Sequence, residues 1–93
     1  MTQKSEVLRE LRKIPGVGAS IALDLYAIGI RSIADLKDKS PEKLYDQSNK
    51  LVGQVQDRCL LYVFRTAVYY AREKRPDPWL LKWWNWKDRR VAK

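Results

Sequence analysis

Apolar residues recur along the chain at three- and four-residue spacing, the pattern of helices with one buried face. The spacing predicts a first helix over about residues 6–14 and a second over about 19–28. Pro15 and Gly16 interrupt the pattern and end the first helix. The residues that we expect to face the core are Val7, Leu8, Leu11, Ile14, Ile21, Ala22, Leu25 and Ile28.

Proline and glycine divide the rest of the chain into further helices. A short helix is expected near Leu36. Ser40 followed by Pro41 predicts a helix start, and this helix ends near Gly53. The longest helix is expected over residues 54–74, and a tryptophan-rich basic helix over about 78–89. No alternating stretch is long enough for a strand, so the pattern predicts one all-α domain over residues 1–93, a compact bundle of five to six short helices.

Composition narrows the function classes. The chain has 93 residues, a formal net charge of +8, no histidine and one cysteine. Without histidine, neither a histidine-activated nucleophile nor a histidine-ligated metal site can form, so we expect no enzyme and no metal site. The single cysteine and the lack of an apolar span indicate a cytoplasmic protein without a membrane partner. Cys59 itself is expected to be a small buried residue. The positive charge favours nucleic acid as a partner.

The excess positive charge lies mainly at the C-terminal end. Residues 72–93 hold eight basic and three acidic residues, whereas residues 1–71 hold eleven and eight. Four tryptophans fall within residues 79–86. Three interpretations stay open for them: packing on the core, a platform for bases or a partner, and an interfacial membrane helix.

The most informative stretch is the turn Pro-Gly-Val-Gly at residues 15–18. Its glycines can adopt backbone angles denied to other residues and leave the amides unshielded. Val17 is the turn side chain able to fill the space between the two helices. The amides of Gly18, Ala19 and Ser20 open the second helix, where the dipole is positive and no helical carbonyl accepts them. Such a helix start can bind a phosphate oxygen.

At this turn the sequence resembles the helix-hairpin-helix family of DNA-binding modules, which have a SAM-like fold. The matching residues are Ile14, Pro15, Gly16, Val17, Gly18, Ala22 and Leu25. The resemblance implies a hairpin over about residues 6–28 that grips the sugar-phosphate backbone without reading sequence. It implies no cofactor except, in some members, a monovalent cation on the hairpin carbonyls. Many members have a lysine where this chain has Ser20, which predicts weaker binding here.

Two further resemblances extend along the chain. Helix-hairpin-helix modules often occur in pairs, and residues 41–73 resemble a degenerate second hairpin whose turn lacks the second glycine. The second rests on the segment DRCLLYVFRTAVYYAREKRPDPWLLKWWNWKD, residues 57–88, following such a hairpin. With it, over roughly residues 10–88, the chain resembles the bacterial pathogenicity locus family, which implies a bacterial, cytoplasmic protein.

The leading hypothesis is sequence-nonspecific DNA binding through the hairpin. The residues expected at the phosphate are Gly16, Val17, Gly18, Ala19, Ser20, Arg12 and Lys13. A second basic and aromatic surface is formed, in this hypothesis, by Arg58, Arg65, Arg72, Lys82, Lys87, Arg89 and Arg90. For the stripe of Arg58, Arg65 and Arg72 along the longest helix, the favoured alternative is a half-buried face on which the guanidinium groups pair with acidic residues. The alternative is a SAM-like protein-interaction or structural module, in which the hairpin is only scaffold and the protein binds a partner or a second copy of itself.

Overall fold

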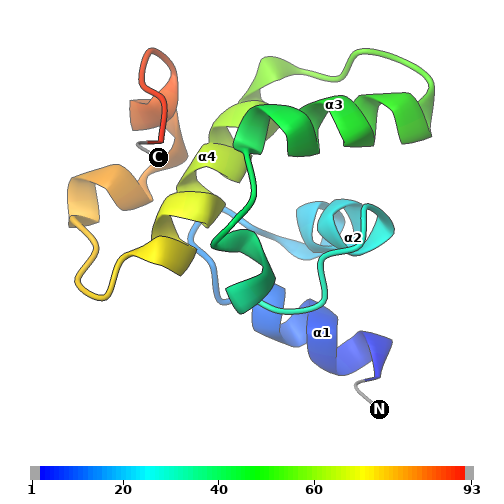
Figure 1. The fold of residues 1–93 in the computed structure, drawn as a ribbon, viewed down its shortest axis with the longest axis horizontal. Helices are drawn as coiled ribbons and strands as arrows, with labels where there is room; N and C mark the ends of the chain where they lie inside the picture. Colours follow the sequence, from blue (N-terminus) through cyan, green and yellow to red (C-terminus); the bar gives the residue numbers. More distant parts are fainter. Residues whose placement is uncertain (1–2, 92–93) are drawn as a thin grey trace.

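Four α-helices and three short 3₁₀ helices make up residues 3–91, the part of the chain that the computed structural model describes (Figure 1). The elements are α1 (Lys4–Leu11), α2 (Ala19–Ala27), η1 (Ala34–Leu36), α3 (Pro41–Val52), α4 (Arg58–Arg72), η2 (Pro78–Leu81) and η3 (Trp83–Trp86). These residues contain no strand, which confirms the all-α prediction. The structure has four α-helices in place of the expected five to six helices, because the elements near Leu36 and after Asp77 are short 3₁₀ helices.

The boundaries of α3 follow local signals in the sequence. The Ser40 side chain accepts a hydrogen bond from the Lys43 backbone N–H at 3.4 Å, and Pro41 occupies the first helical position. Gly53 ends the helix with a left-handed backbone, φ +83°. These residues satisfy or tolerate the unpaired backbone groups of a helix end, so the prediction there needed no tertiary information.

The longest helix, α4, lies at the centre of the molecule. Its residues 61–68 are all buried, and α3, η1, η2 and η3 contact it. Figure 1 shows α3 (green) and the C-terminal segment (orange to red) on different sides of this helix. A helix that is covered on more than one side buries polar residues as well as apolar ones, here Arg65 and Thr66. The amphipathic pattern alone did not predict this burial, because it gives the helix only one inner face.

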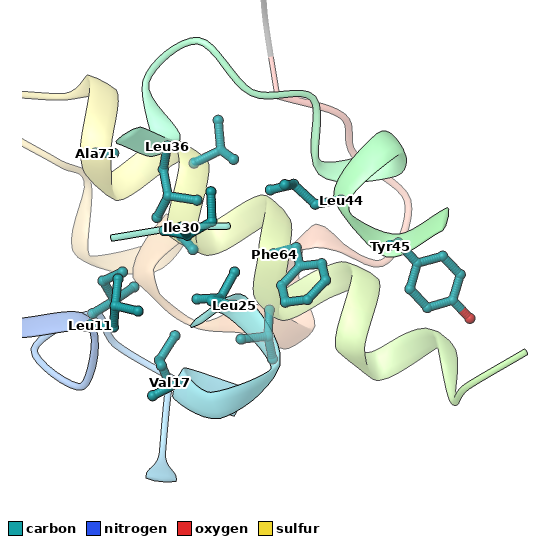
Figure 2. Close-up of a cluster of buried hydrophobic side chains, with 14 of the residues drawn as sticks. Leu11, Val17, Leu25, Ile30, Leu36, Leu44, Tyr45, Phe64 and Ala71 are labelled. Atoms are coloured by element: carbon teal, nitrogen blue, oxygen red, sulfur yellow. The ribbon is translucent and has the colours of Figure 1, made fainter. Parts of the chain in front are cut away.

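Phe64 of α4 is fully buried among side chains from the other helices. Figure 2 shows it between Leu25, which comes from α2, and Leu44, which comes from α3. Val17 points into the same cluster from the turn between α1 and α2, and only 5% of its surface is exposed. The prediction that Val17 fills the space between the first two helices is therefore confirmed.

The tryptophan-rich segment does not form the single helix predicted over about residues 78–89. Lys82 has an extended backbone, φ −96° and ψ 115°, which separates η2 from η3. Because the helical spacing is broken after one turn, the four rings do not share a face. The last two residues of the basic segment 72–93 lie outside the described residues.

Candidate nucleic-acid interface

The turn between α1 and α2, residues 12–18, is called the first turn. The Val17 backbone N–H donates to the Ile14 carbonyl at 3.0 Å, and Gly16 adopts φ +86°. A side chain at Gly16 would strain this backbone and would lie 3.3 Å from Cδ1 of Trp83. Gly16 is therefore required by the turn, as predicted. Val17 uses its amide within the turn and buries its side chain, which leaves neither group to contact a phosphate.

The N-terminus of α2 is open. Gly18 is its N-cap residue and has no side chain to accept a hydrogen bond. The backbone N–H groups of Gly18, Ala19 and Ser20 donate to no group within residues 3–91, and all three residues are exposed. The φ of Gly18 is −92°, so this glycine does not need the special backbone freedom expected of it. Its importance is that nothing lies within 4 Å of the position where a side chain would begin.

Two basic residues precede the open helix end in the sequence. Arg12 and Lys13 follow α1 directly, and both are exposed. Their side chains form no hydrogen bond or ion pair within the described residues. They can therefore turn toward an anion without breaking an existing contact.

The first turn also borders a shallow apolar groove of about 380 Å³. Ile21, Leu60 and Trp83 supply apolar lining, and Asp24 and Asp57 add carboxylates. Burial raises the pKa of the Asp24 carboxyl above its ordinary value. Two carboxylates repel a polyanion, so a phosphate is favoured at the α2 amides over the groove.

The turn between α3 and α4, residues 53–57, is called the second turn, and its helix end is closed. The Asp57 carboxylate accepts a hydrogen bond from the Cys59 backbone N–H at 2.8 Å, which lowers the pKa of Asp57. Asn49 Oδ1 accepts hydrogen bonds from the backbone N–H and the side-chain amide of Gln56, at 3.0 and 3.1 Å. The chain's own carboxylate thus occupies the place that an anion would take at the N-terminus of α4.

Cys59 is exposed, so the prediction that it is buried is wrong. It lies in the first turn of α4, before the buried stretch of the helix begins. The neighbouring Asp57 carboxylate, as a hydrogen-bond acceptor, raises the pKa of the thiol. Because the thiolate is the reactive form, this environment does not activate Cys59 as a nucleophile.

The basic stripe predicted along α4 is not a continuous surface. Arg65 is 5% exposed; its Nε lies 3.0 Å from a Glu42 carboxylate oxygen, and its Nη1 donates to the Trp86 carbonyl at 2.8 Å. Arg72 is half-buried and donates to the Lys37 carbonyl at 2.7 Å. Other segments fold over this side of α4 and accept hydrogen bonds from both guanidinium groups, which agrees with the half-buried interpretation of the stripe at Arg65 and Arg72. The cations of the second surface that do stay exposed are Arg58, Lys82, Lys87, Arg89 and Arg90.

Comparison with known proteins identifies the chain. A match to the pathogenicity locus family spans residues 4–92. The chain belongs to this family. The mitomycin resistance protein McrB of Streptomyces lavendulae is 37% identical over 70 residues, which cover 75% of this chain and 67% of that protein. No solved structure matches. Within residues 3–91, none of the helices of this family member is long and apolar enough to cross a membrane.

Proposed function

We propose that this protein binds DNA without sequence specificity, through the N-terminus of α2 and the basic side chains near it. The observation that carries the proposal is that Gly18, Ala19 and Ser20 are exposed residues whose backbone N–H groups have no acceptor within residues 3–91. A helix N-terminus with open amides favours a phosphate oxygen through both hydrogen bonds and the helix dipole. The name of the Streptomyces relative records a resistance and no ligand, so the proposal rests on geometry.

In this proposal, α1, the first turn and α2 act as a helix-hairpin-helix motif in a SAM-like fold. One backbone phosphate lies at the α2 amides, and Arg12 and Lys13 add charge beside it. The Leu11 and Ile14 carbonyls each accept one backbone N–H, at 3.1 and 3.0 Å. Each oxygen has a second lone pair, which fits a monovalent cation at the turn.

Salt dependence gives a first test of the proposal. Three to five phosphate contacts on duplex DNA give a slope of log K against log salt of about −3 to −4.5. Fluorescence anisotropy of a labelled duplex, titrated at several salt concentrations, measures this slope. Absent binding, or binding indifferent to salt, would contradict the proposal.

A sharper test fills the open helix end. Gly18→Asp places a carboxylate at the α2 amides, where it caps the helix and repels a phosphate. We expect duplex affinity to fall at least about tenfold, as hydrogen bonds to a charged group are lost. Thermal stability should be unchanged or slightly higher, since nothing lies within 4 Å of the added carbon.

Gly18→Ala is the matched control. It adds a carbon at the same place but no acceptor, so it should keep duplex affinity within about twofold while lowering stability slightly. If Gly18→Asp binds the duplex as tightly as Gly18→Ala, the first turn is not the contact.

An exposed apolar patch favours protein interaction as a second candidate function. Leu51, Val52 and Val55, at the end of α3 and in the second turn, are 62%, 50% and 81% exposed. Three exposed aliphatic side chains within five residues form a small apolar patch, which a protein partner or a second copy of the chain could cover. Light scattering over a range of concentrations measures self-association, and Val55→Asp should abolish it if this patch is the contact.

A further inference from the structure

Two of the four tryptophans are not used by the core. Trp86 is 2% exposed, packs at 5.3 Å from the Tyr69 ring and donates its indole N–H to the Leu80 carbonyl. Trp83 covers Gly16 in the first turn. By contrast, Trp79 and Trp84 are 52% and 56% exposed. Exposing two large aromatic rings has a cost in water, so their position indicates a contact outside the chain.

Trp79 and Trp84 line one shallow pocket, and the backbone around them is fixed. The pocket has a volume of about 380 Å³, within the range of small-ligand sites. The Asp77 carboxylate accepts a hydrogen bond from the Trp79 backbone N–H at 2.9 Å, and the Trp79 carbonyl accepts one from the Asn85 side chain at 2.8 Å. Trp84 packs edge-on against Trp83 with ring centroids 5.6 Å apart. The backbone at Trp79 and the ring of Trp84 are therefore held by contacts within the chain.

The charge around this pocket is mostly positive. Lys87 and Arg89 line it, Asp88 is the one acid in its lining, and the exposed Arg90 follows directly. The Arg89 guanidinium lies 5.6 Å from the centroid of the Trp79 ring. Flat aromatic faces beside cations match a ligand that has both a planar ring and a negative group.

We propose that this pocket binds an unpaired nucleotide of a nucleic-acid strand. The base stacks on the Trp79 and Trp84 rings, and its phosphate meets Lys87 and Arg89. Stacking is open to any base, because every base has a π face. The proposal rests on the proposed function and extends it: the first turn holds duplex backbone, and the tryptophan pocket holds a single-stranded end or a displaced base.

The geometry favours this occupant over a membrane surface. An interfacial membrane helix needs a long amphipathic face, and here the segment is broken at Lys82 into two four-residue 3₁₀ turns. The exposed rings also border a polar, charged pocket instead of a continuous apolar face. A nucleotide has a planar base that can stack on the exposed rings and a phosphate that can pair with the cations.

Tryptophan fluorescence tests the proposal on the full chain. We expect a single-stranded eight-residue thymidine oligonucleotide to quench the emission. Trp84→Ala and Trp79→Ala should each weaken single-strand binding at least about fivefold, the loss of one stacked base. Trp84→Phe keeps an aromatic face and should retain most of the affinity. Circular dichroism checks that each variant is folded, as expected for exposed side chains.

Gly18→Asp separates this proposal from the proposed function. It should lower duplex affinity at least about tenfold and leave oligonucleotide affinity within about twofold, whereas Trp84→Ala should lower oligonucleotide affinity at least about fivefold and leave duplex affinity within about twofold. If Trp84→Ala and Trp79→Ala bind the oligonucleotide like the unmodified protein, the pocket proposal is overturned even when duplex binding persists. Quenching by anionic phosphatidylglycerol vesicles without quenching by the oligonucleotide would also overturn it, in favour of a lipid surface.

Discussion

The two turns place a helix N-terminus after a glycine-containing connection, but they treat its open amides in opposite ways. At the first turn, Gly18 offers no side chain, and the amides of the exposed residues Gly18, Ala19 and Ser20 have no acceptor within residues 3–91. At the second turn, the Asp57 carboxylate accepts a hydrogen bond from the Cys59 N–H at 2.8 Å. A helix start that its own chain has capped is stable and closed to anions, whereas an uncapped one gives up some stability and can bind a phosphate.

The valine side chains of the two turns differ in exposure. Val17 is 5% exposed and joins the core, whereas Val55 is 81% exposed. The first turn is therefore anchored from inside and open at its backbone. In the second turn, backbone N–H groups donate to the side chains of Asn49 and Asp57, and the Val55 side chain is exposed. This difference is the reason that the proposed function has the phosphate at the first turn and that the second candidate function has an apolar contact at the second.

The largest expected effect comes from shortening the two valines. Val17→Ala removes buried methyl groups from the core and should lower the free energy of unfolding by about 2 kcal/mol. Val55→Ala, the matched change in the second turn, should alter it by less than about 0.5 kcal/mol. Urea denaturation of both variants measures the difference. Equal losses would contradict the asymmetry of the two turns.

The next effect concerns the cations beside the turns. Replacing Arg12 and Lys13 together by alanine should make the salt slope of duplex binding shallower by about 2 and weaken affinity about tenfold at low salt. Arg58→Ala, beside the capped helix α4, should change affinity by less than about twofold. Anisotropy titrations at several salt concentrations measure both. A larger effect of Arg58→Ala would assign the duplex to the second turn.

Removing the cap of α4 has a smaller effect. Asp57→Ala should lower the melting temperature at neutral pH, because the Cys59 N–H loses its acceptor. The pKa of Asp57 is lowered in the folded state by this hydrogen bond. Its stabilisation is thus fully present above the ordinary aspartate pKa and lost as the pH falls through the lower folded value. Thermal melts should show the two proteins converging in acid; a constant difference down to low pH would rule out the carboxylate as the cause.

The smallest effect is expected at Asp24, in the groove beside the first turn. Burial raises the pKa of Asp24, so protonation favours the folded state and this contribution is lost as the pH rises through the folded value. Asp24→Asn should therefore be slightly more stable than the unmodified protein at neutral pH and equal to it in acid. Loss of the charge should also tighten duplex binding slightly. Weaker duplex binding by Asp24→Asn would place the carboxylate in the contact itself.

Local chemistry made much of the fold predictable. Ser40 and Pro41 begin α3, and Gly53 ends it, because each acts on backbone groups within a few residues. The open start of α2 followed from the same reasoning, since Gly18 carries no acceptor. These features depend on neighbours in sequence and need no knowledge of distant contacts. The first helix was predicted to run to Ile14, before Pro15 and Gly16, whereas α1 ends earlier, at Leu11.

Periodicity did not decide between the two interpretations of the arginine stripe on α4, a nucleic-acid surface and a half-buried face. Periodicity places Arg58, Arg65 and Arg72 on one stripe of the long helix, but it does not reveal what covers that stripe. Arg65 is buried because the Trp86 carbonyl and the Glu42 carboxylate, both far away in the sequence, meet its guanidinium. Residue type was no better guide at Cys59: a free cysteine is usually a small buried residue, but this one lies at the exposed end of α4.

By itself the sequence determined the helical class, the boundaries set by proline, glycine and capping residues, and the uncapped start of α2, because these arise from interactions within one helical turn. Tertiary structure alone decided which tryptophans are buried. The backbone is extended at Lys82, and the Trp86 ring packs against Tyr69. As a result Trp83 and Trp86 pack inward, whereas Trp79 and Trp84 stay exposed. No spacing rule could divide the four, since their directions depend on how the C-terminal segment packs against α4.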